Sequence, residues 1–297
     1  MERAGRGGGH LIPAAGEPRV TVVIPAYNEG DAVVPVLDRL FEAVTLPCEV
    51  LVVVDSPTDT TVAAVDRYRA DEPRLRWVLN TYGRGPANAI RFGIDAATAP
   101  VAVVTMSDGS DDPQQIDELT RLVERGVVVA SASRYMPGGQ QVGGPLLKSA
   151  LSRTAGRSLY HLARVGTRDA TNSFKAYSTA FVREVGISSR AGFEIGIELT
   201  AKARRLRRPV AEIPTIWLDR SFGVSNFKIR KWLPEYLRWY FHAFGREDPA
   251  AHPQTPHGAP AVPAAPTPVA ASAPVAGPPA PVVPPAPAGP PQIHPQT

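Results

Sequence analysis

The stretch "RVTVVIPAYN" at residues 19–28 is short, apolar and rich in β-branched residues, and Pro25 interrupts it. Such a run is typical of a strand that is buried on both faces of a parallel sheet. Similar runs recur at residues 48–55, 75–80, 100–106 and 126–133. Stretches with helical spacing lie between them, at residues 31–44, 59–71, 85–98 and 113–125. The alternation predicts an α/β fold with a mostly parallel sheet and helices on both faces.

The second half of the chain is less regular. We expect helices at about residues 145–165, 193–206 and 229–244, and a strand at residues 210–220. The last of these helices combines aromatic and basic residues. Such a composition suits a helix at a membrane interface, and it equally suits a helix packed on the rest of the protein.

The two ends of the chain differ from its middle in composition. Of the 32 Pro residues, 17 lie in residues 249–297, and no Lys, Arg, Asp or Glu follows Asp248. A Pro/Ala-rich segment of this kind has neither helical nor strand periodicity, so we expect residues 247–297 to be disordered. The Gly-rich residues 1–17 are expected to be disordered as well. This leaves one globular domain at residues 18–228 and a separate amphipathic helix at residues 229–246.

Several classes of site are excluded by composition. The single Cys48 permits no internal disulfide and no cysteine-based zinc site, and the six His are scattered or lie in the tail. We find no signal-peptide pattern and no run of about 18 apolar residues. No RNA- or DNA-binding motif is present, so nucleic acid is not an expected partner. We expect a cytoplasmic protein that is peripheral at the inner face of the membrane.

Charge is distributed unevenly along the chain. Residues 1–126 carry 12 Lys and Arg against 19 Asp and Glu. Residues 127–244 carry 19 Lys and Arg against 7 Asp and Glu. An acidic first half beside a basic second half suits a metal ion and anionic ligands that meet between them. The plain alternative is a basic surface that keeps the protein soluble.

Polar residues follow the predicted strands directly. Open α/β sheets bind ligands beyond the carboxyl ends of their strands, and Asp55 and the acidic stretch "MSDGSDDP" at residues 106–113 fall there. Carboxylates at this spacing suit a hard cation such as Mg²⁺ or Mn²⁺. The alternative is that Asp111 and Asp112 only cap a helix starting at Pro113. Asp108, nearer the strand, is the better candidate ligand.

A series of motifs, in this order, resembles one known family. They are "VVIPAYNEG", "LVVVDSPTDTT", "YGRGPANAIRFG" and "MSDGSDDP", followed by "ASRYMPGG", "LSRTAGRSLYHLARV", "DATNSFKAYS", "GFEIGIELTAKA" and "EIPTIWLDRSFGVSNF". The chain looks like the inverting GT-A glycosyltransferases of family 2, and within them like the polyprenol-phosphate sugar synthases of the dolichol-phosphate mannosyltransferase type. The resemblance covers about residues 19–230 and implies a Rossmann-like GT-A fold.

The resemblance also implies a donor site. Its residues would bind a nucleotide diphosphate sugar, with GDP-mannose expected first and UDP-glucose second: Pro25, Ala26, Tyr27, Glu29, Asp55, Arg84 and Asp108. Asp108 would hold the divalent ion, Mg²⁺ or Mn²⁺, that bridges the diphosphate. Family members usually carry Asp-x-Asp here, but Met106 stands at the first Asp and is no ligand for Mg²⁺. Asp111 supplies the missing carboxylate, or Asp108 holds the metal alone, or metal dependence is weak.

The implied acceptor is a polyprenyl phosphate lipid. Its phosphate is already anionic and needs cationic contacts rather than a general base. The resemblance assigns these contacts to Arg134, Arg153, Arg220 and Ser225, with Asp108 and Arg134 as the catalytic residues. The segment "NSFKAYS" would form a loop over the acceptor channel. The expected reaction is an inverting transfer of a hexose, mannose first, to the lipid phosphate.

Two other functions remain open at this point. A family 2 transferase acting on a sugar hydroxyl of a cell-envelope glycan would need a carboxylate base, for which Glu194 or Glu198 are candidates. These two residues lie four apart on one predicted helix, so structural roles, such as a salt bridge to Lys202, are the favoured interpretation. The non-enzyme alternative is a catalytically degenerate, membrane-associated scaffold, for which Met106 is the best support.

Overall fold

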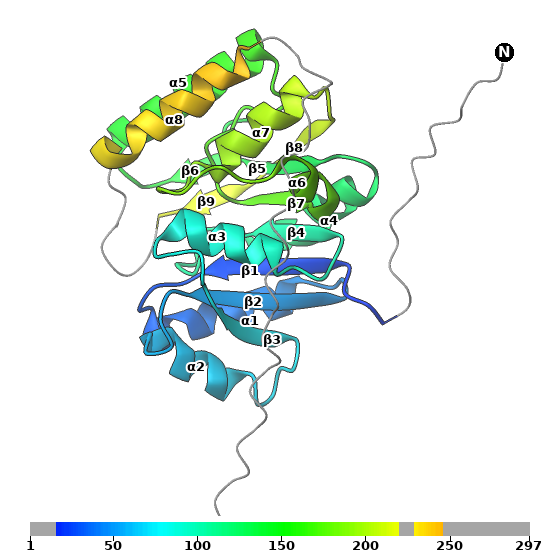
Figure 1. Ribbon diagram of the computed structural model, residues 1–297, viewed down its shortest axis with the longest axis vertical. Coiled ribbons are helices and arrows are strands. Elements are labelled where there is room, and N and C mark those ends of the chain that lie inside the picture. The colour runs from blue at the N-terminus through cyan, green and yellow to red at the C-terminus, as the bar shows by residue number, and fades with distance from the viewer. Residues whose placement is uncertain (1–15, 220–228, 246–297) are drawn as a thin grey trace, which may run out of the picture. The chain divides into compact units, whose positions relative to one another are not determined.

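The computed structural model describes residues 16–219 and 229–245, and a seven-stranded sheet forms its centre (Figure 1). The strand order is β3-β2-β1-β4-β7-β5-β8. All neighbours pair in parallel except β7, which is antiparallel to β4 and β5. The strands are β1 Val20–Pro25, β2 Cys48–Val54, β3 Leu75–Leu79, β4 Val101–Val104, β5 Val129–Ser133, β7 Lys175–Ser178 and β8 Val210–Pro214. The predicted mostly parallel sheet is confirmed.

Helices cover both faces of this sheet, as predicted. One face carries α1 (Val34–Ala43), α2 (Thr60–Tyr68) and α4 (Ile116–Glu124). The other carries α3 (Pro86–Asp95), α6 (Thr179–Val185) and α7 (Ile195–Arg205). Alternate strand residues enter opposite cores: Val22 and Ile24 lie in the first cluster, and Val23 lies in the second. This alternation explains why the strands are apolar throughout, since neither face meets water.

Gly93 sets the distance between α3 and the sheet. A Cβ at this position would lie 2.3 Å from Val23 Cγ1 and 3.0 Å from Val53 Cγ2. Only glycine therefore allows the helix to approach β1 and β2 this closely. The approach fixes the loop that precedes α3, which carries one of the predicted donor-site residues.

The second half departs from the sequence prediction at several places. The segment expected as a loop over the acceptor channel contains β7, whose residues Lys175 and Ala176 are fully buried in the centre of the sheet. The loop prediction is therefore wrong for residues 175–178. Helix α6 was not predicted. The predicted strand at residues 210–220 divides at Thr215 into β8 and the short β9 (Ile216–Leu218), which pairs in parallel with β6 (Gln140–Val142).

Helices α5 (Leu146–Ser158) and α8 (Ile229–Ala243) lie side by side (Figure 1). A π-helical turn, η3 (Leu159–Ala163), extends α5, and 3-10 turns η1 (Gly30–Val33) and η2 (Pro113–Gln115) precede α1 and α4. Ser158 Oγ and Tyr240 Oη are 2.9 Å apart. Leu159, Trp239 and Ala243 share a third apolar cluster with residues of α7. The helix at the end of the described chain therefore packs on α5, η3 and α7.

The described helices include none long and apolar enough to cross a membrane. The segments predicted to be disordered, residues 1–17 and 247–297, lie outside the described residues apart from Gly16 and Glu17.

Candidate functional site

The loop after β1 is tied to the loops that follow two neighbouring strands. The Asn28 amide donates to both carboxylate oxygens of Asp59, at 3.1 and 3.0 Å, and Asn28 adopts a φ of +55°. Glu29 Oε1 accepts a hydrogen bond from Ser107 Oγ at 2.9 Å, which joins the loop to the end of β4. Tyr27 is 62% exposed. The residues predicted to line the nucleotide pocket therefore sit at the carboxyl edge of the sheet: Pro25, Ala26, Tyr27 and Glu29.

Asp55, directly after β2, holds the loop that carries Arg84. Its two carboxylate oxygens accept from Asn80 Nδ2 at 2.7 Å and from the Gly85 amide at 2.8 Å. Gly83 and Gly85 have φ values of +100° and +115°, which few other residues adopt. The structure thus brings two predicted donor-site residues together, Asp55 as the anchor and Arg84 as an exposed cation on the anchored loop.

The acidic stretch after β4 separates into three carboxylates with different surroundings. Asp108 is half-buried, and its Oδ1 accepts a hydrogen bond from the Ser110 amide at 3.1 Å. Asp111 is buried and turns back to the end of β4, where its Oδ2 accepts from the Met106 amide and from Thr105 Oγ1. Asp111 therefore does not cap the following turn.

Asp112 performs the capping role instead. Its Oδ1 accepts from the Gln114 amide at 3.1 Å at the start of η2. Met106, which stands where the family carries an Asp, packs against the apolar cluster beneath α3 and α7. Its side chain is partly buried against this cluster, so Asp108 and Asp111 remain the predicted metal ligands of this stretch.

These two carboxylates fit a divalent cation. Burial and, second, the charge of Asp108 raise the pKa of Asp111 to about 7, against opposing hydrogen bonds from Met106 and Thr105. Two carboxylates close enough to perturb each other in this way are stabilised by a hard cation between them. In the described part of the chain no group of three or more His, Cys, Asp or Glu gathers around one point. A divalent ion held by these two carboxylates would therefore need further oxygen ligands from outside the pair.

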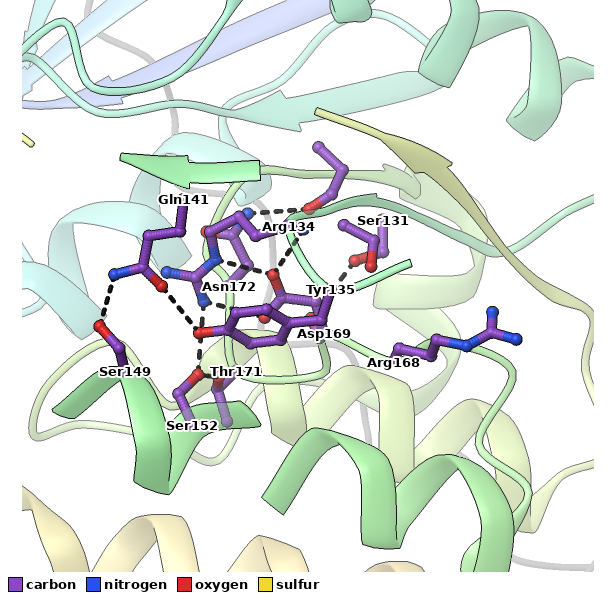
Figure 2. A network of polar contacts seen from close by, with 12 residues as sticks. Ser131, Arg134, Tyr135, Gln141, Ser149, Ser152, Arg168, Asp169, Thr171 and Asn172 are labelled. Carbon is purple, nitrogen blue, oxygen red and sulfur yellow. Dashed lines mark hydrogen bonds and ion pairs between the residues drawn. The ribbon is translucent and has the colours of Figure 1, made fainter. Parts of the chain in front are cut away.

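Arg134, directly after β5, makes a buried two-point ion pair with Asp169 (Figure 2). Its Nε donates to Asp169 Oδ2 at 2.7 Å, its Nη2 to Oδ1 at 2.9 Å, and its amide to Oδ2 at 3.0 Å. Asp169 is fully buried, and although burial opposes it, the Arg134 charge lowers the pKa of this carboxyl. Asp169 thus fixes both the backbone and the side chain of the predicted acceptor-binding arginine.

Tyr135 brings Arg153 to the same place. The guanidinium carbons of Arg134 and Arg153 lie 4.9 and 5.2 Å from the centre of the Tyr135 ring. The Tyr135 hydroxyl donates to Gln141 Oε1 (Figure 2). Ser152, which precedes Arg153 on α5, accepts from Arg134 Nη2 at 3.4 Å. Two cations from distant parts of the chain thus converge around one aromatic ring.

The residues predicted to bind donor and acceptor share the carboxyl edge of the sheet, as far as the structure describes them. The Leu218 amide of β9 donates to the Ser110 carbonyl at 3.1 Å, linking the acidic stretch to the second half of the chain. The charge of Arg134 also acts on Asp111, where it slightly opposes the rise in pKa that burial and Asp108 cause. The other two predicted acceptor residues, Arg220 and Ser225, lie outside the described residues.

Comparison with known proteins agrees with this geometry. The sequence model of glycosyl transferase family 2 matches residues 21–186, which run from β1 through α6. The chain belongs to this family. It is a glycosyltransferase, and its resemblance to polyprenol-phosphate mannosyltransferases is confirmed by relatives of about 30% identity.

For two of those relatives, the match to this chain extends over most of the relative's own sequence. The polyprenol monophosphomannose synthase of Mycolicibacterium smegmatis is 30% identical over 72% of this chain and 86% of its own. The undecaprenyl-phosphate mannosyltransferase of Micrococcus luteus is 30% identical over 70% of this chain and 87% of its own. The dolichol-phosphate mannosyltransferase of Pyrococcus furiosus is 29% identical over 74% of this chain and 62% of its own.

Solved structures confirm the GT-A fold of this family 2 glycosyltransferase. The glucosyl-3-phosphoglycerate synthase of Mycobacterium tuberculosis, solved with Mn²⁺ and UDP, aligns with a TM-score of 0.55 at 17% identity over 78% of this chain and 81% of its own. A mannosyltransferase of Pyrobaculum calidifontis, solved with GDP-mannose and Mn²⁺, aligns with a TM-score of 0.53 at 22% identity over 78% of this chain and 66% of its own.

In this glycosyltransferase, backbone amides bind both of the glutamates considered as general bases. Glu194 accepts from the amides of Ala191 and Gly192, and Glu198 accepts from those of Ser188 and Ser189. Both carboxylates are fully buried. Glu198 also forms the expected salt bridge to Lys202, at 2.6 Å. Their contacts are those of structural residues.

Sequence reasoning missed the residues that support Arg134. Asp169 and Lys175 both lie in the quoted motif "DATNSFKAYS", but nothing in their spacing indicates that Asp169 binds a residue more than 30 positions away. The fully buried Lys175 donates to the backbone carbonyls of Asp169 and Asn172. A buried Lys in a segment of polar residues was the available signal, since such a residue needs partners.

Proposed function

We propose that the protein transfers a hexose, mannose first, from a nucleotide diphosphate sugar to a polyprenyl monophosphate. GDP-mannose is the first donor and UDP-glucose the second. The proposal is supported by relatives named for mannosyl transfer to lipid phosphates, which match about 70% of this chain. The observation that carries it is the pairing at one sheet edge of a carboxylate site, Asp108 and Asp111, with a cationic site, Arg134 and Arg153.

The donor half would hold the nucleotide diphosphate. Asp55 positions the loop that presents Arg84, whose planar fork suits diphosphate oxygens. Asp108 and Asp111 would hold Mg²⁺ or Mn²⁺. When bound, such an ion supplies Lewis-acid neutralisation of the negative charge on the diphosphate. The exposed Tyr27 ring at the end of β1 is available to the nucleoside.

The acceptor half would hold the lipid phosphate. An oxygen of the phosphate monoester attacks the anomeric carbon while the bond from that carbon to the diphosphate breaks, and the electron pair leaves with the nucleoside diphosphate. A single in-line displacement inverts the anomeric configuration. Arg134 and Arg153 would orient the phosphate, together with Arg220 and Ser225 beyond the described residues. No proton needs to be removed, because the acceptor is already an anion.

The contacts of Glu194 and Glu198 favour this reaction over transfer to a sugar hydroxyl. A hydroxyl acceptor requires a carboxylate base within hydrogen-bond reach of the acceptor oxygen. Both glutamates are fully buried and already accept two backbone N–H bonds each. Both oxygens of each carboxylate are thus already occupied by hydrogen bonds within the fold.

The outward face of α8 supports a place at the membrane surface. Trp232 and Trp239 point into the protein and are 6% and 4% exposed. On the outward face four large apolar side chains remain exposed: Leu233, Leu237, Phe241 and Phe244. With the exposed Arg238 they form a stripe suited to the interface of an anionic bilayer. We propose that the protein is peripheral at the inner face of the membrane through this stripe.

The donor is tested with purified protein, polyprenyl phosphate and a panel of radiolabelled nucleotide sugars, each with Mg²⁺, with Mn²⁺ or with EDTA. We expect an organic-extractable labelled product with GDP-mannose and a divalent ion. No extractable product from any donor would overturn the proposal.

A further inference from the structure

Trp217 is the middle residue of β9, and its side chain points to the opposite face of the strand from those of its two neighbours. Side chains alternate between the two faces of a strand. Ile216 and Leu218 are 45% and 46% exposed, whereas Trp217 is half-buried. Trp217 belongs to none of the three apolar clusters that the described residues form. A large aromatic side chain that faces inward but lies outside the core is a candidate for contact with a ligand.

Strand β9 contacts both groups of residues in the proposed transfer site. The Leu218 amide donates to the carbonyl of Ser110 at 3.1 Å, and Ser110 follows Asp108 by two residues. One residue before Leu218, the centre of the Trp217 ring lies 5.9 Å from the guanidinium carbon of Arg134. Neighbouring residues of β9 thus contact the acidic stretch and the acceptor arginine. The Trp217 ring lies between the proposed donor and acceptor residues.

The loop after β6 holds the Trp217 ring at its rim. A Cβ on Gly144 would lie 3.4 Å from Cζ3 and 3.7 Å from Cη2 of Trp217, and 3.2 Å from Gln141 Nε2. Gly144 has a φ of +85°, a conformation that few other residues adopt. Cζ3 and Cη2 are rim atoms of the indole, so this backbone meets the ring at its edge. The contact orients the ring without stacking on its face.

Arg134 is held in place by other residues than Trp217. Three hydrogen bonds to Asp169 fix its amide and its guanidinium. The ring of Tyr135 is also nearer to its guanidinium carbon than the ring of Trp217, at 4.9 Å against 5.9 Å. The longer distance is at the outer limit of a cation–π contact, which is about 6 Å. Holding the arginine is therefore not a sufficient reason for an indole at position 217.

The proposed reaction determines what lies between the two groups of residues. In a single in-line displacement the anomeric carbon lies between the departing diphosphate and the attacking phosphate oxygen. In that reaction the diphosphate is bound beside Asp108 and the attacking phosphate beside Arg134, so the sugar occupies the space that β9 borders. The C–H groups of a pyranose ring pack favourably on the electron-rich face of an indole, because apolar burial and electrostatic attraction act together.

We propose that Trp217 forms one wall of the subsite for the transferred sugar and contributes to the affinity for the sugar half of the donor. The inference rests on the proposed function, because it takes from it a nucleotide diphosphate sugar as donor. It assigns to Trp217 a contact with the sugar, and none with the nucleotide or the lipid. Three observations support it: the half-buried ring outside the core, the contact that orients its rim, and its place between the acidic stretch and Arg134.

Binding measurements without a lipid acceptor test this assignment. Calorimetry with Mn²⁺ gives the Kd of GDP and of GDP-mannose for the full-length wild type and for Trp217→Ala, Trp217→Leu and Trp217→Phe. Leucine keeps apolar volume but removes the aromatic face, so the Trp217→Leu variant decides the question if Trp217→Ala does not fold. Ile216→Ala, on the outward face of the same strand, is the matched control for disturbance of β9. If the wild type binds neither GDP nor GDP-mannose, UDP and UDP-glucose take their place.

We expect Trp217→Ala and Trp217→Leu to bind GDP-mannose about tenfold more weakly than the wild type, while the Kd of GDP changes by less than about twofold. Trp217→Phe should retain most of the affinity for GDP-mannose, and Ile216→Ala all of it. Equal weakening of both ligands would mean that Trp217 supports the fold, and unchanged binding of both would mean that it does not contact the sugar. Either result overturns the inference, as does a wild type that binds neither pair of ligands.

The outcome of this test does not depend on the acceptor. If the wild type makes no lipid-linked product but the Trp217 variants selectively lose affinity for GDP-mannose, the proposed function fails and the sugar subsite is supported. If the product forms and the variants bind GDP-mannose as tightly as the wild type, the sugar subsite fails and the proposed function is supported. A higher KM for polyprenyl phosphate, with both nucleotide affinities unchanged, would assign the Trp217 ring to the acceptor and overturn the inference.

Discussion

Arg134 and Asp169 are 35 positions apart in the sequence, yet three hydrogen bonds from Arg134 converge on the Asp169 carboxylate. A buried carboxylate that binds both the amide and the guanidinium of one residue leaves that arginine little freedom. The strand end that positions Arg134 and the loop that positions Asp169 thus form a single unit. In this account Asp169 is a positioning residue for the acceptor arginine.

Asp169→Asn tests this role. The amide keeps one acceptor oxygen but loses the charge, so Arg134 is no longer held at two points. We expect KM for polyprenyl phosphate to rise about tenfold or more while KM for GDP-mannose changes less than twofold, measured by initial rates. Because breaking a buried pair can cost about 3–5 kcal/mol, folding is checked by circular dichroism at the assay temperature. Equal increases in both KM values would show that Asp169 supports the fold rather than Arg134.

Substitutions of Asp108 and of Asp111 in the acidic stretch should have different effects on transfer. Asp108→Ala should lower transfer by at least 100-fold at any metal concentration, since it removes the half-buried ligand. Asp111→Ala should instead raise the Mn²⁺ concentration needed for half-maximal rate, because Asp108 and the diphosphate still bind the ion. Asp112→Ala, which removes only a turn cap, is the control. Metal titrations of initial rate check all three, and an unchanged Mn²⁺ requirement in Asp111→Ala would remove Asp111 from the ligand set.

Lys175 makes stability depend on pH. Burial lowers its pKa to about 7, against the raising effect of the Asp169 charge. Between pH 7 and about 10 the unfolded chain binds a proton at Lys175 that the folded protein lacks, so the free energy of unfolding rises with pH in this window. Below pH 7 both states bind this proton, so Lys175 no longer makes the free energy of unfolding change with pH.

Lys175→Met removes this dependence. We expect that, between pH 7 and pH 9, the free energy of unfolding of the wild type, measured with urea, rises by up to about 3 kcal/mol relative to that of the variant. The slope of this rise is no more than about 1.4 kcal/mol per pH unit. Other titrating groups cancel in the difference between the two proteins. A constant difference across this range would mean that Lys175 stays charged in the fold.

The outward stripe of α8 is tested by Phe241→Ser. Phe241 is 66% exposed, so the change should leave the folded protein intact while reducing cosedimentation with anionic vesicles about tenfold. Leu79→Ser, at the end of β3 on the first half of the chain, is the matched control, with a residue that is 37% exposed. Vesicle binding that is equally weakened in both variants, or in neither, would argue against α8 as the membrane contact.

The regular half of the fold is predictable from the sequence because buried parallel strands appear as continuous β-branched runs. Strand β7 was missed for a physical reason: it has four residues, begins with a buried Lys and is inserted between β4 and β5 from a distant part of the chain. Strand β6 was missed because it has three residues and, in the described part of the chain, pairs with the equally short β9, so its local pattern carries little signal.

For the candidate site, the positions of several residues could be predicted from the sequence, but their contact partners could not. Asp55 and Arg134 follow strands directly and Asp108 lies four residues after β4, so their place at the carboxyl edge follows from topology alone. The partner of Arg134 could not be predicted, because the contact with Asp169 depends on β7 lying beside β5. The hydrogen bonds of Asp111 to Thr105 and Met106 could not be predicted either, since they compete with the helix capping that the sequence equally allowed.

The central claim is that the acceptor nucleophile is a phosphate oxygen of a lipid. It is tested most directly by incubating the protein with radiolabelled GDP-mannose and either polyprenyl phosphate or the polyprenol of the same chain length. The account predicts a lipid-linked labelled sugar with the phosphate acceptor and at least 100-fold less with the alcohol, since Arg134 and Arg153 then have no anion to orient. Comparable transfer to the alcohol, or transfer only to a glycan hydroxyl, would contradict it.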